Sequence, residues 1–302
     1  MNLDGTGEPG RGPQGSGRRR WRWLVTGLAV VAALASACSD GFDSGDEAAT
    51  GSASAPPATG SAAVSPSLEQ PNRRCGGPDT GATLVRFTAS DGTGLNGVLV
   101  GSGTTGVVLV HEYPEDLCGA WPFGTYLAER GMRAFAVDLR CFGHSACPDG
   151  EARLRVIDDV AAAVAELRRR GATTIALVGS SMGGAAALIA ATTVRPGVAA
   201  VVAVSTPADP SDRIGIPLNA GTAVNRLQVP TMFVVATNDQ NVPVEESRAM
   251  HQAVNSTDKD LTVLSDQFDG QHGWQLLDNP AGAGFSSVAA QVAAFVTAHT
   301  RR

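Results

Sequence analysis

The sequence predicts an α/β protein with a doubly wound, mostly parallel sheet of about eight strands and helices on both faces. Short, continuous apolar runs, which are typical of strands buried on both faces, recur from residue 107 onward. Helical stretches lie between these runs, so strand and helix alternate. In such a sheet, ligands bind at the carboxyl ends of the strands.

The elements follow one another along the chain in a regular order. Residues 83–89 and 95–100 alternate apolar and polar side chains around a D-G-T-G turn, which predicts an antiparallel strand pair. Buried strands are expected at 107–110, 134–137, 174–178, 199–204, 231–236 and 261–264. Helices are expected at 121–130, 154–170, 182–193, 245–254 and 285–297. Because only residues 205–230 separate two of the strands, no cap domain is expected.

The first 37 residues are typical of an export signal. Arg18, Arg19 and Arg20 precede an uncharged apolar run over 23–37 that is too short to span a bilayer comfortably. This run ends in Leu-Ala-Ser-Ala directly before Cys38, which resembles a bacterial lipobox. The resemblance implies cleavage in front of Cys38 and a diacylglycerol on its thiol. The alternative is ordinary signal cleavage, which would leave a secreted, soluble protein.

A segment rich in Gly, Ala, Ser, Thr and Pro follows the predicted anchor. Residues 38–79 have too few apolar side chains to offset their chain entropy, which predicts a disordered tether ahead of a domain over 80–302. The expected location of that domain is the outer face of a bacterial cell membrane. A net charge of −6 argues against nucleic acid as a partner.

Four cysteines lie beyond the predicted anchor: Cys75, Cys118, Cys141 and Cys147. An even number in an exported chain favours two disulfides, for which three pairings are possible. Four buried free thiols are the alternative, which an oxidising compartment disfavours.

The segment after the strand at 174–178 reads G-S-S-M-G-G and continues directly into an Ala-rich helix. A nucleophile elbow requires a strand, a sharp turn with small neighbours and a helix, so Ser181 is the candidate nucleophile. The amides at the start of the helix would point toward an oxyanion formed there. The alternative is a Gly-rich turn without chemistry.

A serine hydroxyl needs a base to remove its proton, and the chain has five histidines. His272 is the expected base, because it follows the last strand in a loop with Gly near it on both sides. His251 and His299 are expected at the surface. His111 and His144 lie in loops where they could line the site without acting as the base.

The expected carboxylate of this set is Asp239. It follows the strand at 231–236 and precedes a helix, at the carboxyl end of the sheet. Its alternative role is to cap a turn or helix, as Asp does in many such loops. Asp266 and Asp269 are rivals that lie close to His272 in sequence and are expected to shape its loop instead.

Ser181, Asp239 and His272, in this chain order, resemble the α/β-hydrolase superfamily over about residues 80–302. The segment D-L-R-C-F-G-H-S at 138–145 also resembles the superfamily's loop after its fourth strand. Cys141 stands where that loop usually has Gly, which suggests that a disulfide fixes it. The resemblance implies the α/β-hydrolase fold and a Ser-His-Asp triad.

The resemblance also implies an oxyanion hole formed by the backbone amides of Met182 and Tyr113. Many members have His-Gly before the second of these residues, whereas this chain has His111-Glu112, closer to the dienelactone-hydrolase branch. Glu112 is expected to face the pocket, where it would hold the serine hydroxyl or bind substrate; the alternative is a surface glutamate. His111-Glu112 is not a zinc motif, because Pro114 prevents the required helix and the second His is absent.

The expected function is hydrolysis of a carboxylic ester through an acyl-enzyme intermediate on Ser181. A lidless cleft would take a small-molecule or acyl substrate, and the reaction requires neither a metal nor an organic cofactor. Peptidase or thioesterase activity on the same fold is one alternative, because the sequence does not specify the leaving group. A catalytically silent binding lipoprotein is an alternative of another class.

Overall fold

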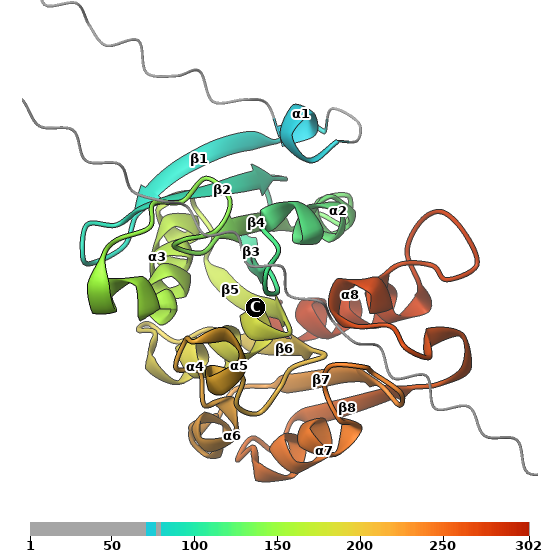
Figure 1. Ribbon diagram of the computed structural model, residues 1–302. Coiled ribbons are helices and arrows are strands. Elements are labelled where there is room, and N and C mark those ends of the chain that lie inside the picture. Colours follow the sequence, from blue (N-terminus) through green and yellow to red (C-terminus); the bar gives the residue numbers. More distant parts are fainter. Residues whose placement is uncertain (1–70, 77–79, 302) are drawn as a thin grey trace, which may run out of the picture. The chain divides into compact units, whose positions relative to one another are not determined.

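The computed structural model describes residues 71–76 and 80–301 (Figure 1). The predicted signal peptide over 1–37, the predicted lipid-attached Cys38 and most of the predicted tether over 38–79 lie outside these residues. The described residues form one mostly parallel sheet with helices on both faces, which confirms the predicted fold class.

The sheet has eight strands in the order β1-β2-β4-β3-β5-β6-β7-β8. They are β1 (Thr83–Thr88), β2 (Gly94–Val100), β3 (Thr105–Val110), β4 (Arg133–Asp138), β5 (Thr174–Ser180), β6 (Ala200–Val204), β7 (Thr231–Ala236) and β8 (Lys259–Leu264). β2 runs antiparallel to both β1 and β4, and all later neighbours are parallel. Each strand overlaps a predicted one, and the predicted antiparallel pair is confirmed.

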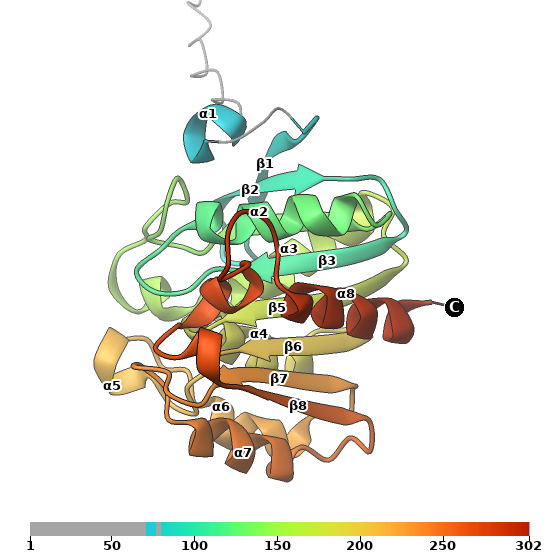
Figure 2. The ribbon, with the colours of Figure 1, turned by 90° about the vertical axis from the view of Figure 1, so that its right-hand side faces the viewer.

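The helices are α1 (Pro71–Cys75), α2 (Leu117–Ala128), α3 (Val156–Arg169), α4 (Met182–Thr193), α5 (Ser211–Ile214), α6 (Ala220–Ala223), α7 (Val244–Ala253) and α8 (Ser287–Thr300). Short 3₁₀ turns are η1 (Gly150–Leu154), η2 (Val224–Arg226), η3 (Asp266–Phe268) and η4 (Gly273–Leu277). Figure 2 shows α2 and α8 against one face of the sheet. Val107 and Leu109 of β3 pack in the core on that side, whereas Val108 and Val110 point to the core beneath α3 and α4.

Helix α2 begins at Leu117, four residues before the predicted start. Asp116 is its N-cap, and the Asp116 carboxylate accepts a hydrogen bond from the Cys118 N–H at 2.8 Å. The helix continues through Pro122. Gly119, Gly124 and this proline weaken the helical pattern in the sequence, and the cap together with packing on the sheet outweighs them.

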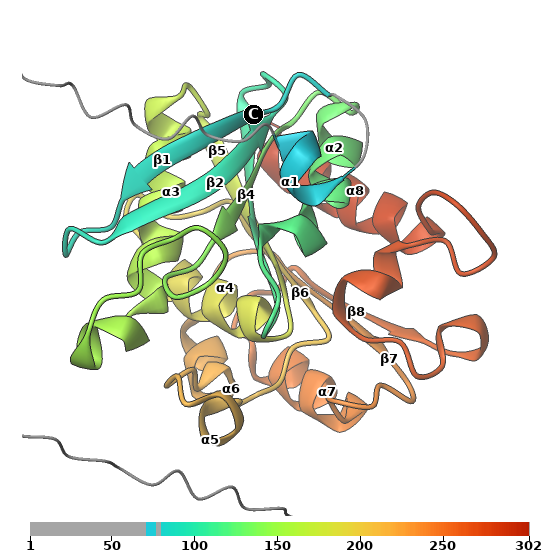
Figure 3. The same cartoon turned by 45° about the horizontal axis from the view of Figure 1, so that its top comes forward.

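Helix α1 belongs to a segment that the sequence assigned to the tether. Figure 3 shows α1 beside α2, and a disulfide joins Cys75 of α1 to Cys118 of α2. Arg74 adds ion pairs of 2.8 Å to both Asp116 and Asp138. The C-terminal end of the predicted tether is therefore attached to the sheet rather than free of it.

The segment between β6 and β7 carries only the short helices α5 and α6 and the turn η2. It is therefore a set of short turns and not a separate layer over the carboxyl ends of the strands. In the part of the chain that the structure describes, no helix combines the length and apolar character needed to cross a bilayer.

Candidate active site

Ser181 lies in a sharp turn between β5 and α4. Its backbone has φ +49° and ψ −117°, a conformation that a non-glycine residue adopts only when its surroundings enforce it. The Ser181 N–H donates to the Val204 carbonyl of β6 at 2.8 Å. A Cβ on Gly183 would overlap the carbonyl oxygen of Val110 in β3, so glycine is needed for α4 to approach the sheet. This is the geometry of the predicted nucleophile elbow.

His272 lies in the loop between η3 and η4, and its Nδ1 atom is 2.9 Å from each carboxylate oxygen of Asp239. Asp239 is fixed in turn, because one of its oxygens accepts the N–H groups of Asn241 and Val242 at 2.8 and 3.0 Å. Since a carboxylate can only accept hydrogen bonds, Nδ1 carries the proton and Nε2 is the free basic atom of the neutral ring.

The Asp239 carboxylate is inaccessible to solvent. Burial acts to raise its pKa, but the hydrogen bonds from His272 and the Asn241 amide outweigh this effect, so the pKa lies below its ordinary value. Asp239 is therefore ionised at neutral pH and orients the His272 ring. Neither Asp266 nor Asp269 hydrogen-bonds to this ring among the described residues.

A cavity of about 280 Å³ lies at the carboxyl ends of the strands. It is lined by Tyr113, Ser181, Met182, Pro207, Pro210, Arg213, Ile214, Asn241 and His272. Ser181 and His272 thus meet at one cavity, although no hydrogen bond joins the Ser181 hydroxyl to the His272 ring among the described residues. Apo sites often hold such pairs apart until a substrate is bound.

Tyr113 and Met182, the residues expected to form an oxyanion hole, line the same cavity as Ser181. Met182 is the first residue of α4, so its N–H has no acceptor within the helix and lies where the helix dipole is positive. Tyr113 belongs to the loop between β3 and α2, and among the described residues its N–H has no hydrogen-bond partner.

His111 and Glu112, which were expected in the pocket, are not among the residues that line it. His111 is fully buried, its Nε2 accepts the Leu139 N–H at 3.2 Å, and its Nδ1 donates to the Glu112 carbonyl at 2.9 Å. Burial lowers the pKa of His111, so the neutral ring acts as a bridge between two loops.

The Glu112 carboxylate accepts a hydrogen bond from the hydroxyl of Ser180, the residue before the candidate nucleophile. It also accepts the backbone N–H of Trp274 and interacts electrostatically with His272. Burial raises the pKa of Glu112 in spite of these favourable contacts. A Cβ on Gly273 would overlap the carboxylate, so Glu112 packs directly against the loop that carries His272.

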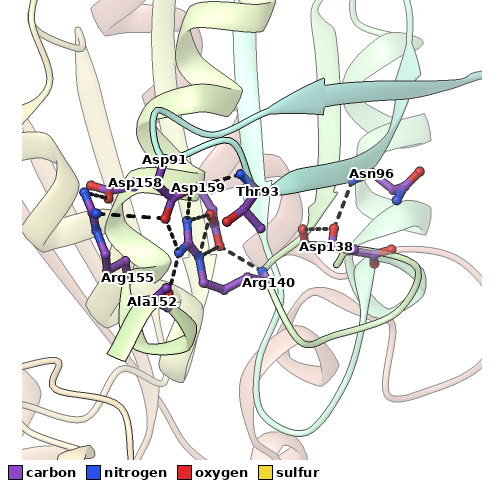
Figure 4. A network of polar contacts seen from close by, with 10 residues as sticks. Asp91, Thr93, Asn96, Asp138, Arg140, Ala152, Arg155, Asp158 and Asp159 are labelled. Atoms are coloured by element: carbon purple, nitrogen blue, oxygen red, sulfur yellow. Dashed lines mark hydrogen bonds and ion pairs between the residues drawn. The ribbon is translucent and has the colours of Figure 1, made fainter. Parts of the chain in front are cut away.

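The loop after β4 contains a charged network that sequence reasoning missed (Figure 4). Arg140 is fully buried, and its Nη2 and Nη1 atoms form ion pairs of 2.6 Å with Asp159 and 2.7 Å with Asp91. The network joins this loop to α3 and to the turn between β1 and β2. Nothing in the local sequence indicates it, because its members lie in three separate segments.

The same loop carries the disulfide between Cys141 and Cys147, and the second disulfide joins Cys75 to Cys118. Two disulfides are therefore formed, as predicted, and these are the pairings. Cys141 has φ +67°, a left-handed conformation that favours glycine. His144 belongs to this loop and does not line the cavity.

Two further cavity residues, Arg213 and Asn241, were not singled out from the sequence. Arg213 lies on α5 and Asn241 in the loop after β7, and the Arg213 Nη1 atom donates to the Asn241 carbonyl at 2.9 Å. In the ranges 71–76 and 80–301, no group of His, Cys, Asp or Glu side chains is arranged to hold a metal ion.

Residues 104–223 match the family described as "Serine aminopeptidase, S33". The uncharacterised protein YfhR of Escherichia coli is 32% identical over 148 residues, which are 45% of this chain and 51% of that protein. YfhR of Salmonella typhimurium is 30% identical over 131 residues, or 40% of this chain and 44% of that protein. The chain thus spans about half the length of these relatives.

Solved structures of esterases resemble the fold. An esterase of Pyrococcus furiosus has a TM-score of 0.62 at 18% identity and covers 76% of this chain and 94% of its own. An esterase of Exiguobacterium antarcticum has a TM-score of 0.57 at 17% identity and covers 70% and 99%. The chain is therefore an α/β-hydrolase by fold, with a serine aminopeptidase-like region over residues 104–223.

Proposed function

We propose that the protein is a serine hydrolase that cleaves carboxylic esters, with Ser181, His272 and Asp239 as its catalytic triad. The observation that carries this proposal is the strained Ser181 turn at the cavity that it shares with His272, whose Nδ1 is held by Asp239. Each feature has a catalytic use: a hydroxyl at the cavity, a basic Nε2 and an ionised carboxylate that orients the ring.

In the proposed reaction the Nε2 atom of His272 takes the Ser181 proton as Oγ attacks the ester carbonyl. Asp239 stabilises the imidazolium, and the N–H groups of Met182 and Tyr113 stabilise the negative charge on the carbonyl oxygen. His272 then gives the proton to the leaving alcohol, which leaves an acyl group on Ser181. Water, deprotonated by the same Nε2 atom, releases the carboxylic acid and restores the serine.

The test is a panel of para-nitrophenyl esters, thioesters and amino-acid anilides, assayed with the wild-type protein and Ser181→Ala. The proposal predicts that ester hydrolysis is fastest and that Ser181→Ala lowers kcat at least about 1,000-fold. Ser180→Ala keeps the Ser181 hydroxyl and removes only the hydrogen bond to Glu112, so it should cost far less than Ser181→Ala. Ester hydrolysis that persists in Ser181→Ala would refute the triad.

A peptidase is the second candidate, and the match to the serine aminopeptidase family favours it. The same panel separates the two, because a peptidase would cleave the anilides at rates comparable to the esters. A thioesterase would show the same preference for thioesters. A catalytically silent binding lipoprotein would hydrolyse none of these substrates.

We further propose that the protein is exported and attached to the outer face of the cell membrane through a lipid on Cys38. Two disulfides fit an oxidising compartment outside the cytoplasm. In a bacterium that processes lipoproteins, the wild-type chain should enter the detergent phase on Triton X-114 separation, whereas Cys38→Ser should stay in the aqueous phase. Equal partitioning of both chains would exclude the lipid anchor.

A further inference from the structure

We propose that the active-site cavity selects esters that carry a free carboxylate, and that Arg213 binds that carboxylate. This inference rests on the proposed function and adds the substrate class. Arg213 belongs to α5 and lines the cavity together with Ser181 and His272, so a substrate bound for attack by Ser181 passes within its reach.

The Arg213 side chain is held at the cavity by one contact. Its Nη1 atom donates to the Asn241 carbonyl at 2.9 Å, and Asn241 lines the same cavity from the loop after β7. Within the described part of the chain, Arg213 forms no ion pair and its other N–H groups have no hydrogen-bond partner. A guanidinium has five N–H donors in a planar fork, so a free edge remains that suits a carboxylate.

The charges around the cavity favour an anion. No Asp or Glu side chain is among the residues that line it, and Arg213 and His272 are the two basic ones. Asp209 and Asp212 lie near Arg213 in sequence, but among the described residues neither forms an ion pair with it. Asp209 accepts hydrogen bonds from Ser211 and Asn219. In a chain with a net charge of −6, this unpaired cation makes the cavity a local site of attraction for anionic substrates.

The rest of the lining is mainly apolar. Pro207, Pro210 and Ile214 come from the same segment as Arg213, and Met182 lies beside the candidate nucleophile. The ligand that fits this lining has a hydrocarbon body and one carboxylate, as in a half-ester of a dicarboxylic acid or an ester of a hydroxy acid.

Arg213 could instead serve only to brace α5 against Asn241, and the choice of variant separates these roles. Arg213→Gln keeps an N–H donor for the Asn241 carbonyl but removes the charge. Arg213→Lys keeps the charge but not the fork. Arg226→Gln is the matched control, because Arg226 is exposed, forms no ion pair with a described residue and lies outside the cavity lining.

The measurement is the ratio of kcat/KM for an ester with a terminal carboxylate to that for the same ester with a terminal carboxamide. In one substrate pair the carboxylate or carboxamide is on the acyl chain, and in a second pair it is on the alcohol. The pair with the higher ratio shows which of the two parts of the ester Arg213 binds. We expect a wild-type ratio of about five, the size of a partly exposed charge-assisted contact. The ratio should fall to about one in Arg213→Gln, be intermediate in Arg213→Lys and stay at the wild-type value in Arg226→Gln.

Screening provides a second readout on the wild-type protein, which stays informative if a variant does not fold. The wild-type ratio should fall as sodium chloride rises to 0.5 M. At that concentration the Debye length is a few Å, about the distance between the two charges of an exposed ion pair, so salt weakens their attraction. A wild-type ratio of one or less in both pairs, or a ratio unchanged in Arg213→Gln, overturns the inference. A wild-type protein that hydrolyses none of these esters would instead overturn the proposed function.

Discussion

Glu112 shows at the scale of a single residue how the loop that carries His272 is supported. Its carboxylate accepts hydrogen bonds from the Ser180 hydroxyl and the Trp274 N–H and packs against Gly273, so it contacts residues on both sides of the Ser181–His272 pair without lining the cavity. We interpret Glu112 as a positioning residue whose charge also favours the imidazolium that His272 forms during catalysis.

Replacing Glu112 with Gln tests this interpretation, because Gln keeps an oxygen acceptor for Ser180 and Trp274 but removes the charge. We expect kcat/KM at neutral pH to fall about tenfold through a lower kcat, with KM little changed. The matched control is Glu115→Gln, which removes an exposed charge from the same loop. If Glu112→Gln leaves kcat unchanged, Glu112 has only a structural role.

The pH dependence of stability gives a second check on Glu112. Burial raises the pKa of Glu112 in the folded protein above its value in the unfolded chain. Protonated Glu112 therefore stabilises the fold below the unfolded pKa, and this stability is lost as the pH rises through the folded pKa. Urea unfolding of the wild type should therefore show this loss as pH rises above about 4.5, the ordinary value for Glu. Glu112→Gln should not show it and should be at least as stable as the wild type at neutral pH.

At the scale of elements, Arg140 joins the loop after β4 to α3 and to the turn between β1 and β2. Because Arg140 and Asp159 are both buried, removing one leaves an unpaired charge in the core. We predict that Arg140→Met lowers the free energy of unfolding by about 3 kcal/mol in chemical denaturation, and that Asp159→Leu added to it recovers part of this loss.

Arg155 is the matched control for Arg140. It forms an ion pair with Asp158 in the same network, but its side chain is 53% exposed. Arg155→Met should therefore cost less than about 1 kcal/mol. Equal losses for the Arg140 and Arg155 variants would show that burial of the network does not contribute to stability.

The elements were also where sequence patterns were most informative. Continuous apolar runs predicted the buried strands, since a strand covered on both faces has no polar side. The start of α2 was missed, because its glycines and Pro122 hide a helix that Asp116 caps. The pairing of the cysteines could not be predicted, because it depends on contacts between α1 and α2 that are distant in sequence.

At the scale of the whole molecule, chain order predicts that Ser181, Asp239 and His272 lie at one edge of the sheet, because each follows a strand of one parallel sheet. The contributions of Arg74, Arg140 and Arg213 could not be predicted in the same way. Each depends on a partner from another element, and no local pattern marks such a pair. The pairs are Arg74 with Asp116, Arg140 with Asp159, and Arg213 with Asn241.

The central claim is that Ser181 is the nucleophile, and covalent labelling by a fluorophosphonate tests it most directly. Intact-mass spectrometry should show one adduct per chain, and peptide mapping should place it on Ser181. Ser180→Ala should still react, whereas Ser181→Ala should not. A wild-type protein that forms no adduct, or an adduct that persists in Ser181→Ala, would contradict the claim.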